Sequence, residues 1–411
     1  MAILHRTRTV PTLMPRYTER FRCIGPACED TCCASWSIHI DKKTYKAYRQ
    51  ETGSEVGKLL SKNLLRLDAS DNSATYAAIQ PVGKNRQCPA MQDGLCAIHS
   101  QLGESYISNL CFSYPRRTRS MAGQIEQALT LSCPEAARLA LLAEDAFEFV
   151  EGSIAVREAG VEPIEPHQGL ALDTMNEVRI FCINLMRTRE LALWQRMTLL
   201  GVLCDALVRH CETGQQAAVP ALLAQFAGLV ESGQVLAPFE ALAPDHRAQA
   251  MVFATLWAEK GFDTDSAFQQ AIIERISARL GADEYGQASA ETLVASYTRG
   301  LARLDDALAQ APFLLENYLL NELFSRLFPF NAPNAYDSFL VLTARFGLLR
   351  LLLAAECSGE GPLPSVSELL AVVHLHCRRF QHDTDYTTRV HGALRDSDWA
   401  SLDKVTTLLR T

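Results

Sequence analysis

The chain has 411 residues, enough for about two or three domains, and its 48% hydrophobic and 21% charged content is typical of a soluble globular protein. No run approaches the roughly 20 apolar residues of a membrane helix, so membrane insertion is not expected. The net charge of −8 is uneven: residues 1–138 carry 18 basic and 12 acidic side chains, and residues 139–411 carry 21 and 35. This balance argues against a nucleic-acid partner for the larger part. An acidic surface suits a lysine-bearing substrate, and it equally suits plain solubility.

Eight of the thirteen cysteines lie in the first third of the chain, in segments typical of loops. Residues 1–17 lack the continuous apolar run of a secretory signal, so we expect a cytoplasmic protein in a reducing compartment. Disulfides are disfavoured there, and clustered thiols favour metal binding. The eight predicted metal ligands are Cys23, Cys28, Cys32, Cys33, Cys88, Cys96, Cys111 and Cys133. The other five cysteines are scattered through apolar helical sequence and are typical of core residues.

The N-terminal part, residues 1–138, is predicted to be a small, irregular cysteine-rich metal-binding domain. A helix is expected after Asp41, which is placed as an N-cap, and it should stop near Gly53. The further expected elements are a strand within 74–83, a short helix within 96–111 and a strand within 124–133.

Helical periodicity begins at Pro134 and continues through the rest of the chain. The spacing predicts a helix over 135–152, followed by a linker rich in Pro, Gly and acidic residues over 156–169. We therefore assign 139–164 to the helix end and linker, and 165–411 to a large all-α domain. Its expected helices are 172–187, 190–212, 216–232, 245–260, 265–280, 290–309, 313–328, 335–357, 365–380 and 397–409. The expected fold class is mainly α, with no fixed period of a tandem repeat.

The cysteine spacing favours a [4Fe–4S] cluster over zinc. Such a cluster takes several thiolates from one short loop and others from distant segments, and residues 23–33 can supply the local set. Pro134 directly after Cys133 is also typical of the end of bacterial ferredoxin ligand runs. A structural zinc site usually has two short knuckles; Cys28-x₃-Cys32 fits one, but seven residues separate Cys88 from Cys96. Eight thiols exceed one site, so either four are spare or there is a second centre.

Familiar catalytic motifs are absent from the sequence. The three-cysteine loop of radical S-adenosylmethionine enzymes is broken, because Ser35 stands where its third cysteine would be. No glycine-rich strand–turn–helix, nucleophile elbow or H-E-x-x-H occurs. The motifs alone therefore assign no reaction.

Aromatic and histidine side chains accompany the cysteines. Trp36 and Tyr114 flank the cysteine loops and would shield a metal from water, which tunes its potential. His39 and His99 could replace a thiolate as ligands, or they are ordinary surface histidines.

One helical segment, 314–328, carries polar residues in an apolar setting. Asn317 and Asn321 stand at i, i+4 beside Tyr318, and a buried amide or phenol needs a partner. That partner is either a neighbouring helix or a ligand. Glu316 and Tyr318 are within reach to hold or deprotonate an amine, and we predict them as catalytic residues.

Several motifs together resemble the flagellin lysine-N-methylase family (FliB-type). They are M-P-R-Y-T-E-R-F-R-C-I-G-P-A-C-E-D-T-C-C from Met14, C-P-A-M-Q-D-G-L-C-A-I-H from Cys88, C-F-S-Y-P-R-R from Cys111, and L-S-C-P-E-A-A-R-L from Leu131. Residues 23–134 also resemble a broader family of cysteine-rich zinc- or iron-chelating domains, and L-E-N-Y-L-L-N-E-L-F from Leu315 resembles the methylases' downstream region.

The resemblance implies a protein-lysine N-methyltransferase that moves methyl groups from S-adenosylmethionine to lysine ε-amines of flagellin. We expect the active site where the two domains meet, with Trp36, Tyr114, Asn317 and Asn321 binding the donor. The metal would be structural, or it would chelate the donor's amino-carboxylate. Two alternatives stay open: an iron–sulfur redox protein, and a non-catalytic zinc-stapled protein that binds flagellin.

Overall fold

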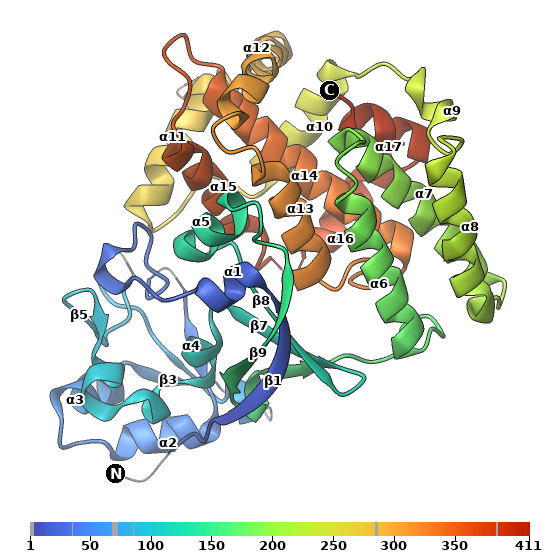
Figure 1. The fold of residues 1–411 in the computed structure, drawn as a ribbon. Coiled ribbons are helices and arrows are strands. Elements are labelled where there is room, and N and C mark those ends of the chain that lie inside the picture. Colours follow the sequence, from blue (N-terminus) through green and yellow to red (C-terminus); the bar gives the residue numbers. More distant parts are fainter. Residues whose placement is uncertain (1–3, 35, 68–72, 85, 284–286, 384) are drawn as a thin grey trace. The chain divides into compact units, whose positions relative to one another are not determined.

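The computed structural model describes the chain except residues 1–3, 35, 68–72, 85, 284–286 and 384 (Figure 1). The chain divides into two compact units. The first is made of Met1–Ala136, Glu148–Pro163 and Phe262–Ala271; the second is made of Ala137–Phe147, Ile164–Gly261 and Ile272–Thr411. Each unit therefore contains segments from separate parts of the sequence.

A five-stranded sheet forms the framework of the first unit, in the order β10-β7-β8-β1-β9. Its strands are β1 (Arg8–Pro15), β7 (Arg116–Met121), β8 (Gln124–Leu129), β9 (Phe149–Val156) and β10 (Val161–Pro163). β1 pairs with β9 antiparallel along its whole length and with β8 in parallel. A two-residue turn joins β7 to β8, with φ of 49° at Ala122 and 81° at Gly123, as a tight hairpin requires.

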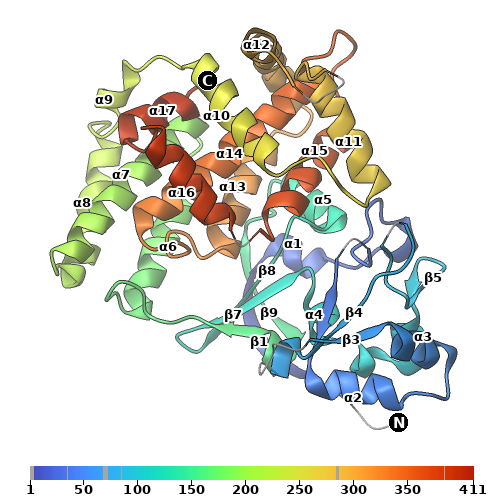
Figure 2. The same ribbon diagram turned by 180° about the vertical axis from the view of Figure 1, so that it is seen from behind.

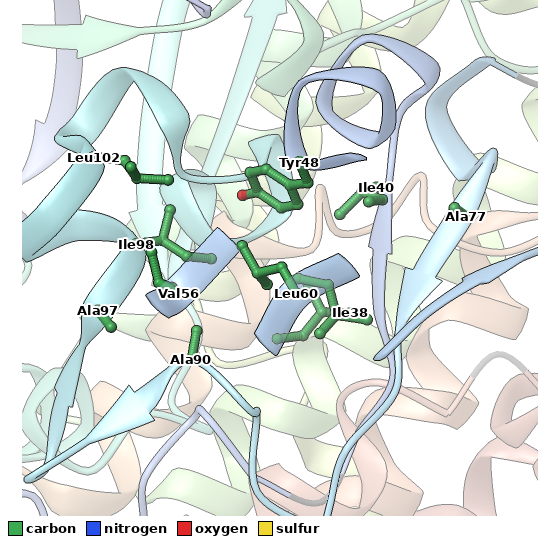
Figure 3. Close-up of a cluster of buried hydrophobic side chains, with 11 residues drawn as sticks. Ile38, Ile40, Tyr48, Val56, Leu60, Ala77, Ala90, Ala97, Ile98 and Leu102 are labelled. Atoms are coloured by element: carbon green, nitrogen blue, oxygen red, sulfur yellow. The ribbon is translucent and has the colours of Figure 1, made fainter. Parts of the chain in front are cut away.

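A smaller layer packs its own core within the first unit. The antiparallel sheet β2-β4-β3 comprises β2 (Ile38–Ile40), β4 (Ala77–Ile79) and β3 (Leu64–Arg66), and the helices α2 (Lys42–Gln50) and α3 (Glu55–Asn63) lie between these strands in the chain. Asp41 caps α2 by accepting a hydrogen bond from the Thr44 amide at 2.8 Å, as predicted. Figure 3 shows the buried side chains of this core, among them Ile38, Tyr48 and Leu60.

Short elements complete the first unit. They are α1 (Arg16–Arg20), η1 (Gly25–Ala27), η2 (Ser73–Thr75), β5 (Met91–Gln92), β6 (Leu95–Cys96), η3 (Ile98–Leu102), η4 (Glu104–Tyr106), α4 (Asn109–Ser113) and η5 (Glu158–Gly160). The short helix expected within 96–111 is thus three separate turns. Cys96 lies in β6, Cys111 lies in α4, and Cys28 directly follows η1.

The second unit is helical (Figure 2). Its helices are α6 (Leu172–Met186), α7 (Leu193–Glu212), α8 (Val219–Glu231) preceded by η6 (Gln216–Ala218), α9 (Ala237–Glu240), α10 (His246–Glu259), α12 (Ala290–Leu308), α13 (Leu314–Ser325), α14 (Ala335–Cys357), α15 (Val366–Phe380), α16 (Tyr386–Asp396) and α17 (Leu402–Leu409). Two more, α5 (Pro134–Leu142) and α11 (Ala267–Arg279), begin in one unit and end in the other.

α14 is the central helix of this unit, in contact with α7, α10, α12, α15, α16 and α17. By length and composition alone it could cross a membrane, yet every residue of its most apolar 18-residue window is buried inside the protein. A hydrophobic helix surrounded by other helices is what a large helical core requires.

The mainly α fold class is confirmed, and several expectations are corrected. The N-terminal part is not irregular, because a five-stranded sheet organises it. The predicted helix 135–152 ends at Leu142, and strand β9 begins at Phe149. The predicted linker 156–169 contributes the end of β9 and strand β10, which pairs with β7 in parallel. Helices α1, α3, α9 and α16 were not predicted.

Candidate functional site

The eight N-terminal cysteines all lie in the first unit, and all thirteen cysteines of the chain are in the thiol state. Cys23 is exposed and the other seven are half-buried. Cys88, Cys96 and Cys111 pack against the core that contains Tyr48, which couples this part of the thiol set to the fold.

Four thiols form what we call the inner thiol group: Cys32, Cys88, Cys96 and Cys111. Burial raises the pKa of Cys111 to about 12, and repulsion from the neighbouring Cys88, Cys96 and Cys32 contributes to this shift, since a second thiolate would repel the first. Burial likewise raises the pKa of Cys88 to about 11, with Cys96 and Cys32 as charged neighbours. Residues far apart in the sequence are therefore close enough to affect each other's ionisation.

Cys32 also belongs to the outer thiol group, with Cys23, Cys28 and Cys133. Burial raises the pKa of Cys28 to about 11, and Cys32 and Cys23 contribute in the same direction. Burial raises the pKa of Cys133 to about 12, again with Cys28 and Cys32 as neighbours. Seven of the eight thiols thus fall into two groups that share Cys32, and Cys33 is not among these charged neighbours in either group.

The donor chemistry of these groups fits zinc or an iron–sulfur cluster, because thiolates are the ligands both prefer. Their positions are not those of a finished ligand set: within the described residues, no three or more His, Cys, Asp or Glu side chains are arranged to hold a metal ion. The raised pKa values of Cys28, Cys88, Cys111 and Cys133 mean that these thiols are protonated at neutral pH. Metal binding would have to release those protons.

Trp36 and Tyr114 come together beside the thiols. Their ring centroids lie 5.9 Å apart, and the Trp36 indole N–H donates to the Cys32 carbonyl at 2.5 Å. The Tyr114 hydroxyl donates to the Ser132 carbonyl at 2.9 Å, next to Cys133. His39 and His99 are both exposed. The aromatic pair is therefore anchored to the backbone at Cys32 and at Ser132, the residue before Cys133.

The four polar residues predicted in the helical part lie buried on α13 of the second unit. The Glu316 carboxylate accepts from Arg189 Nε at 2.9 Å through one oxygen and from Arg196 Nη1 at 2.7 Å through the other. The Tyr318 hydroxyl lies 3.0 Å from His376 Nε2, and burial raises the pKa of Tyr318 well above its usual value.

The two asparagines of α13 also have protein partners. Asn317 Nδ2 donates to the Ala143 carbonyl at 2.9 Å, and the Asn321 side-chain oxygen accepts from Ser325 Oγ at 3.3 Å. The sequence left two kinds of partner open for these polar residues, another part of the protein or a ligand. The structure supplies protein partners. Whether a ligand also binds here stays a prediction.

A buried ion-pair network around Glu322 was not anticipated. Glu322 lies 2.9 Å from Arg326 Nε and 3.1 Å from Arg345 Nη1, and it accepts from Gln381 Nε2 at 2.9 Å. Burial alone would raise the pKa of Glu322, but the two arginines and Gln381 lower it to about 2. The i, i+4 spacing of Glu322 and Arg326 in an apolar helix was the signal in the sequence that could have revealed it.

A surface hollow of about 330 Å³ opens beside the Glu316–Arg196 pair. Its lining residues come from the start of α7, the end of α12 and the start of α13: Leu193, Arg196, Asp305, Leu308, Ala309, Ala311, Pro312, Leu315 and Glu316. Apolar walls surround a few charged groups, as is common in small-molecule sites.

Comparison with known proteins places the chain in a family. Residues 179–408, more than half of the chain, match the model of the FliB lysine N-methylase C-terminal domain. The chain therefore belongs to the FliB lysine N-methylase family.

The individual relatives agree with this assignment. The chain is similar to the lysine-N-methylases of Salmonella typhimurium and Salmonella choleraesuis, each 24% identical over 401 residues that span 92% of this chain and 93% of the relative. It is also similar to the flagellar biosynthetic protein FliU of Salmonella muenchen, 30% identical over 122 residues that span 29% of this chain and 71% of the relative. No solved structure matches the chain.

Proposed function

We propose that the protein transfers methyl groups from S-adenosylmethionine to lysine ε-amino groups of flagellin. The observation that carries the proposal is similarity along nearly the whole chain to proteins named lysine-N-methylase. The flagellar name of the third relative supports a flagellar protein as substrate. The reaction would take place in the cytoplasm, before flagellin is exported.

The reaction is a displacement at the methyl carbon. The lone pair of the neutral lysine amine forms the new C–N bond, the C–S bond breaks, and S-adenosylhomocysteine leaves with the electron pair. The methylated ammonium then loses a proton to solvent or to a protein base. Alignment and desolvation of the two reactants would supply most of the rate.

The predicted catalytic residues have limited roles open to them. Tyr318, with its raised pKa, stays protonated at neutral pH and can hold an amine by a hydrogen bond rather than deprotonate it. Glu316 has both oxygens engaged by arginines, so an amine would have to share or displace one of these contacts. Holding the amine is therefore the role that suits Tyr318, whereas Glu316 fixes the side chains of Arg189 and Arg196.

We further propose that the N-terminal thiols hold a [4Fe–4S] cluster, with zinc as the alternative. Methyl displacement needs no electron transfer, so the metal would stabilise the fold of the first unit or bind the donor's amino-carboxylate. The inner thiol group offers the four thiols that one such site needs.

The test is anaerobic purification, metal analysis, and incubation with S-adenosylmethionine and flagellin, with lysine methylation read by mass spectrometry. We expect iron and methylated flagellin, and loss of both on Cys111→Ala or Cys88→Ala, two members of the inner thiol group. Cys211→Ala is the control, because Cys211 is also half-buried but lies on α7. Iron loss with full methylation would refute both proposed roles of the metal.

The same preparation separates the two alternative functions. Colourless zinc protein that binds flagellin without methylating it would support the binding protein. Visible absorption that bleaches and recovers with one-electron donors, again without methylation, would support the redox protein.

A further inference from the structure

We propose that the hollow formed by α7, α12 and α13 binds the amino-acid end of the methyl donor, with Arg196 holding the α-carboxylate and Asp305 the α-ammonium. This inference rests on the proposed function for the identity of the ligand. The site itself lies wholly within the second unit.

Arg196 is the main evidence for this site, because its guanidinium is buried and one of its N–H donors is not used. It is only 7% exposed, and its Nη1 donates to the Met186 carbonyl at 2.6 Å and to Glu316 at 2.7 Å. Its Nε is buried and has no hydrogen-bond partner among the described residues. Such a group is costly to leave unpaired, so a ligand that accepts its hydrogen bond is favoured.

The unused Nε lies on the edge of the guanidinium that pairs with carboxylates. The N–H groups of Nε and Nη2 point in parallel and match the two oxygens of one carboxylate. Because Nη1 is fixed by Met186 and Glu316, the guanidinium is held in place before any ligand arrives. A preorganised donor pair loses little entropy on binding.

The opposite charge is available on the same hollow. Asp305 is exposed at the end of α12, and within the described part of the chain its carboxylate has neither an ion pair nor a hydrogen bond. Leu193, Leu308 and Leu315 line the same hollow, and their apolar side chains suit methylene groups and a sulfonium-linked chain. A guanidinium, an apolar wall and a free carboxylate together match a zwitterionic amino acid.

A lysine side chain of the substrate fits this hollow less well. Its ammonium would approach the buried positive charge of Arg196, while Glu316 is already neutralised by Arg189 and Arg196. A carboxylate at the same place gains from that charge. The amino-carboxylate therefore needs no metal to hold it, which leaves the structural role for the N-terminal thiols.

The experiment compares two ligands that differ only at the amino-acid end. Calorimetry with the purified full chain measures binding of S-adenosylhomocysteine and of 5′-methylthioadenosine, which lacks the amino and carboxylate groups. Arg196→Lys keeps the positive charge but loses the paired N–H donors of the guanidinium. It should weaken S-adenosylhomocysteine binding by about 10- to 100-fold and leave the affinity for methylthioadenosine unchanged. Asp305→Asn should weaken the same ligand by about 3- to 10-fold.

Asp306→Asn is the matched control, because Asp306 is an equally exposed neighbour that does not line the hollow. Should Arg196→Lys fail to fold, Asp305→Asn decides the result, since its side chain is exposed. Unchanged S-adenosylhomocysteine binding by both variants, or equal loss of both ligands in Asp305→Asn, would overturn the inference.

Failure of the proposed function gives a different pattern. If the wild-type protein methylates flagellin and the variants bind the donor normally, the proposed binding site is refuted and the proposed function is supported. If the wild-type protein binds S-adenosylhomocysteine through Arg196 but methylates nothing, the proposed function is refuted and the proposed binding site is supported. Absence of both binding and methylation refutes both.

Discussion

Replacement of Glu322 by Gln should strongly destabilise the second unit. The carboxylate lies between Arg326 and Arg345, whose side chains are only 13% and 5% exposed. Glutamine keeps the shape but leaves two poorly hydrated guanidinium groups without their counter-ion. Loss of one partner of a buried ion pair costs about 3–5 kcal/mol, and we expect about 3 kcal/mol because Gln still accepts hydrogen bonds. In a unit of roughly 250 residues that corresponds to a Tm about 6–12 °C lower.

The assay is urea unfolding followed by circular dichroism, with the midpoint compared at constant m-value. Asp205→Asn is the control, because it breaks an exposed i, i+4 pair with Arg209 (41% and 64% exposed) and should cost no more than about 0.5 kcal/mol. Adding Arg345→Met to Glu322→Gln should recover part of the loss, since it removes one unpaired charge. If Glu322→Gln cost no more than the control, the buried network would not be a stabilising unit and the reasoning would fail.

Further predictions concern pH and helix packing. Burial lowers the pKa of His376 from 6.5 to about 3 and the arginines lower that of Glu322 from 4.5 to about 2, so the unfolded chain takes up protons first as the pH falls. The free energy of unfolding should therefore decline below pH 6.5 and more steeply below pH 4.5, by up to about 1.4 kcal/mol per pH unit for each group. His376→Asn should make the first decline shallower in a urea titration series, and His5, whose pKa is also lowered by burial, should account for the rest. Gly300→Ala should destabilise by about 1–3 kcal/mol, because the new Cβ would lie 1.9 Å from the Ala354 carbonyl oxygen and force α12 from α14. Gly228→Ala, in a helix with nothing within 4 Å of the new Cβ, should instead stabilise by about 0.5–1 kcal/mol; equal midpoints for the two variants would contradict the packing of α12 on α14.

Local signals in the sequence were sufficient for most helices. Asp41 was recognised as a cap, and the apolar stretch 335–357 coincides with α14. These features depend on residues within a few positions of each other, which periodicity can detect.

Features that depend on distant partners were missed or misread. Residues 149–152 were predicted as the end of a helix and 156 as the start of a linker, but Phe149–Val156 pairs as β9 with β1, which lies about 140 residues earlier. The sequence predicted buried polar residues on α13, but it could not indicate that Tyr318 meets His376 or that Asn317 meets Ala143. The sharing of Cys32 between two thiol groups is likewise a property of the fold and not of the spacing.

The segment Phe262–Ala271 has a consequence for the order in which the protein is made. Asp30 accepts hydrogen bonds from Ser266 Oγ and Gln269 Nε2, each at 2.8 Å, across 236 and 239 residues. On the ribosome, the first unit therefore cannot complete its contacts when Pro163 emerges, and it must wait until Ala271 has been synthesised. At ordinary elongation rates this delay is about 5–20 s. During that interval the thiols of the first unit are already synthesised while the segment that completes the unit is not, so the proposed metal would have access to them before the unit closes.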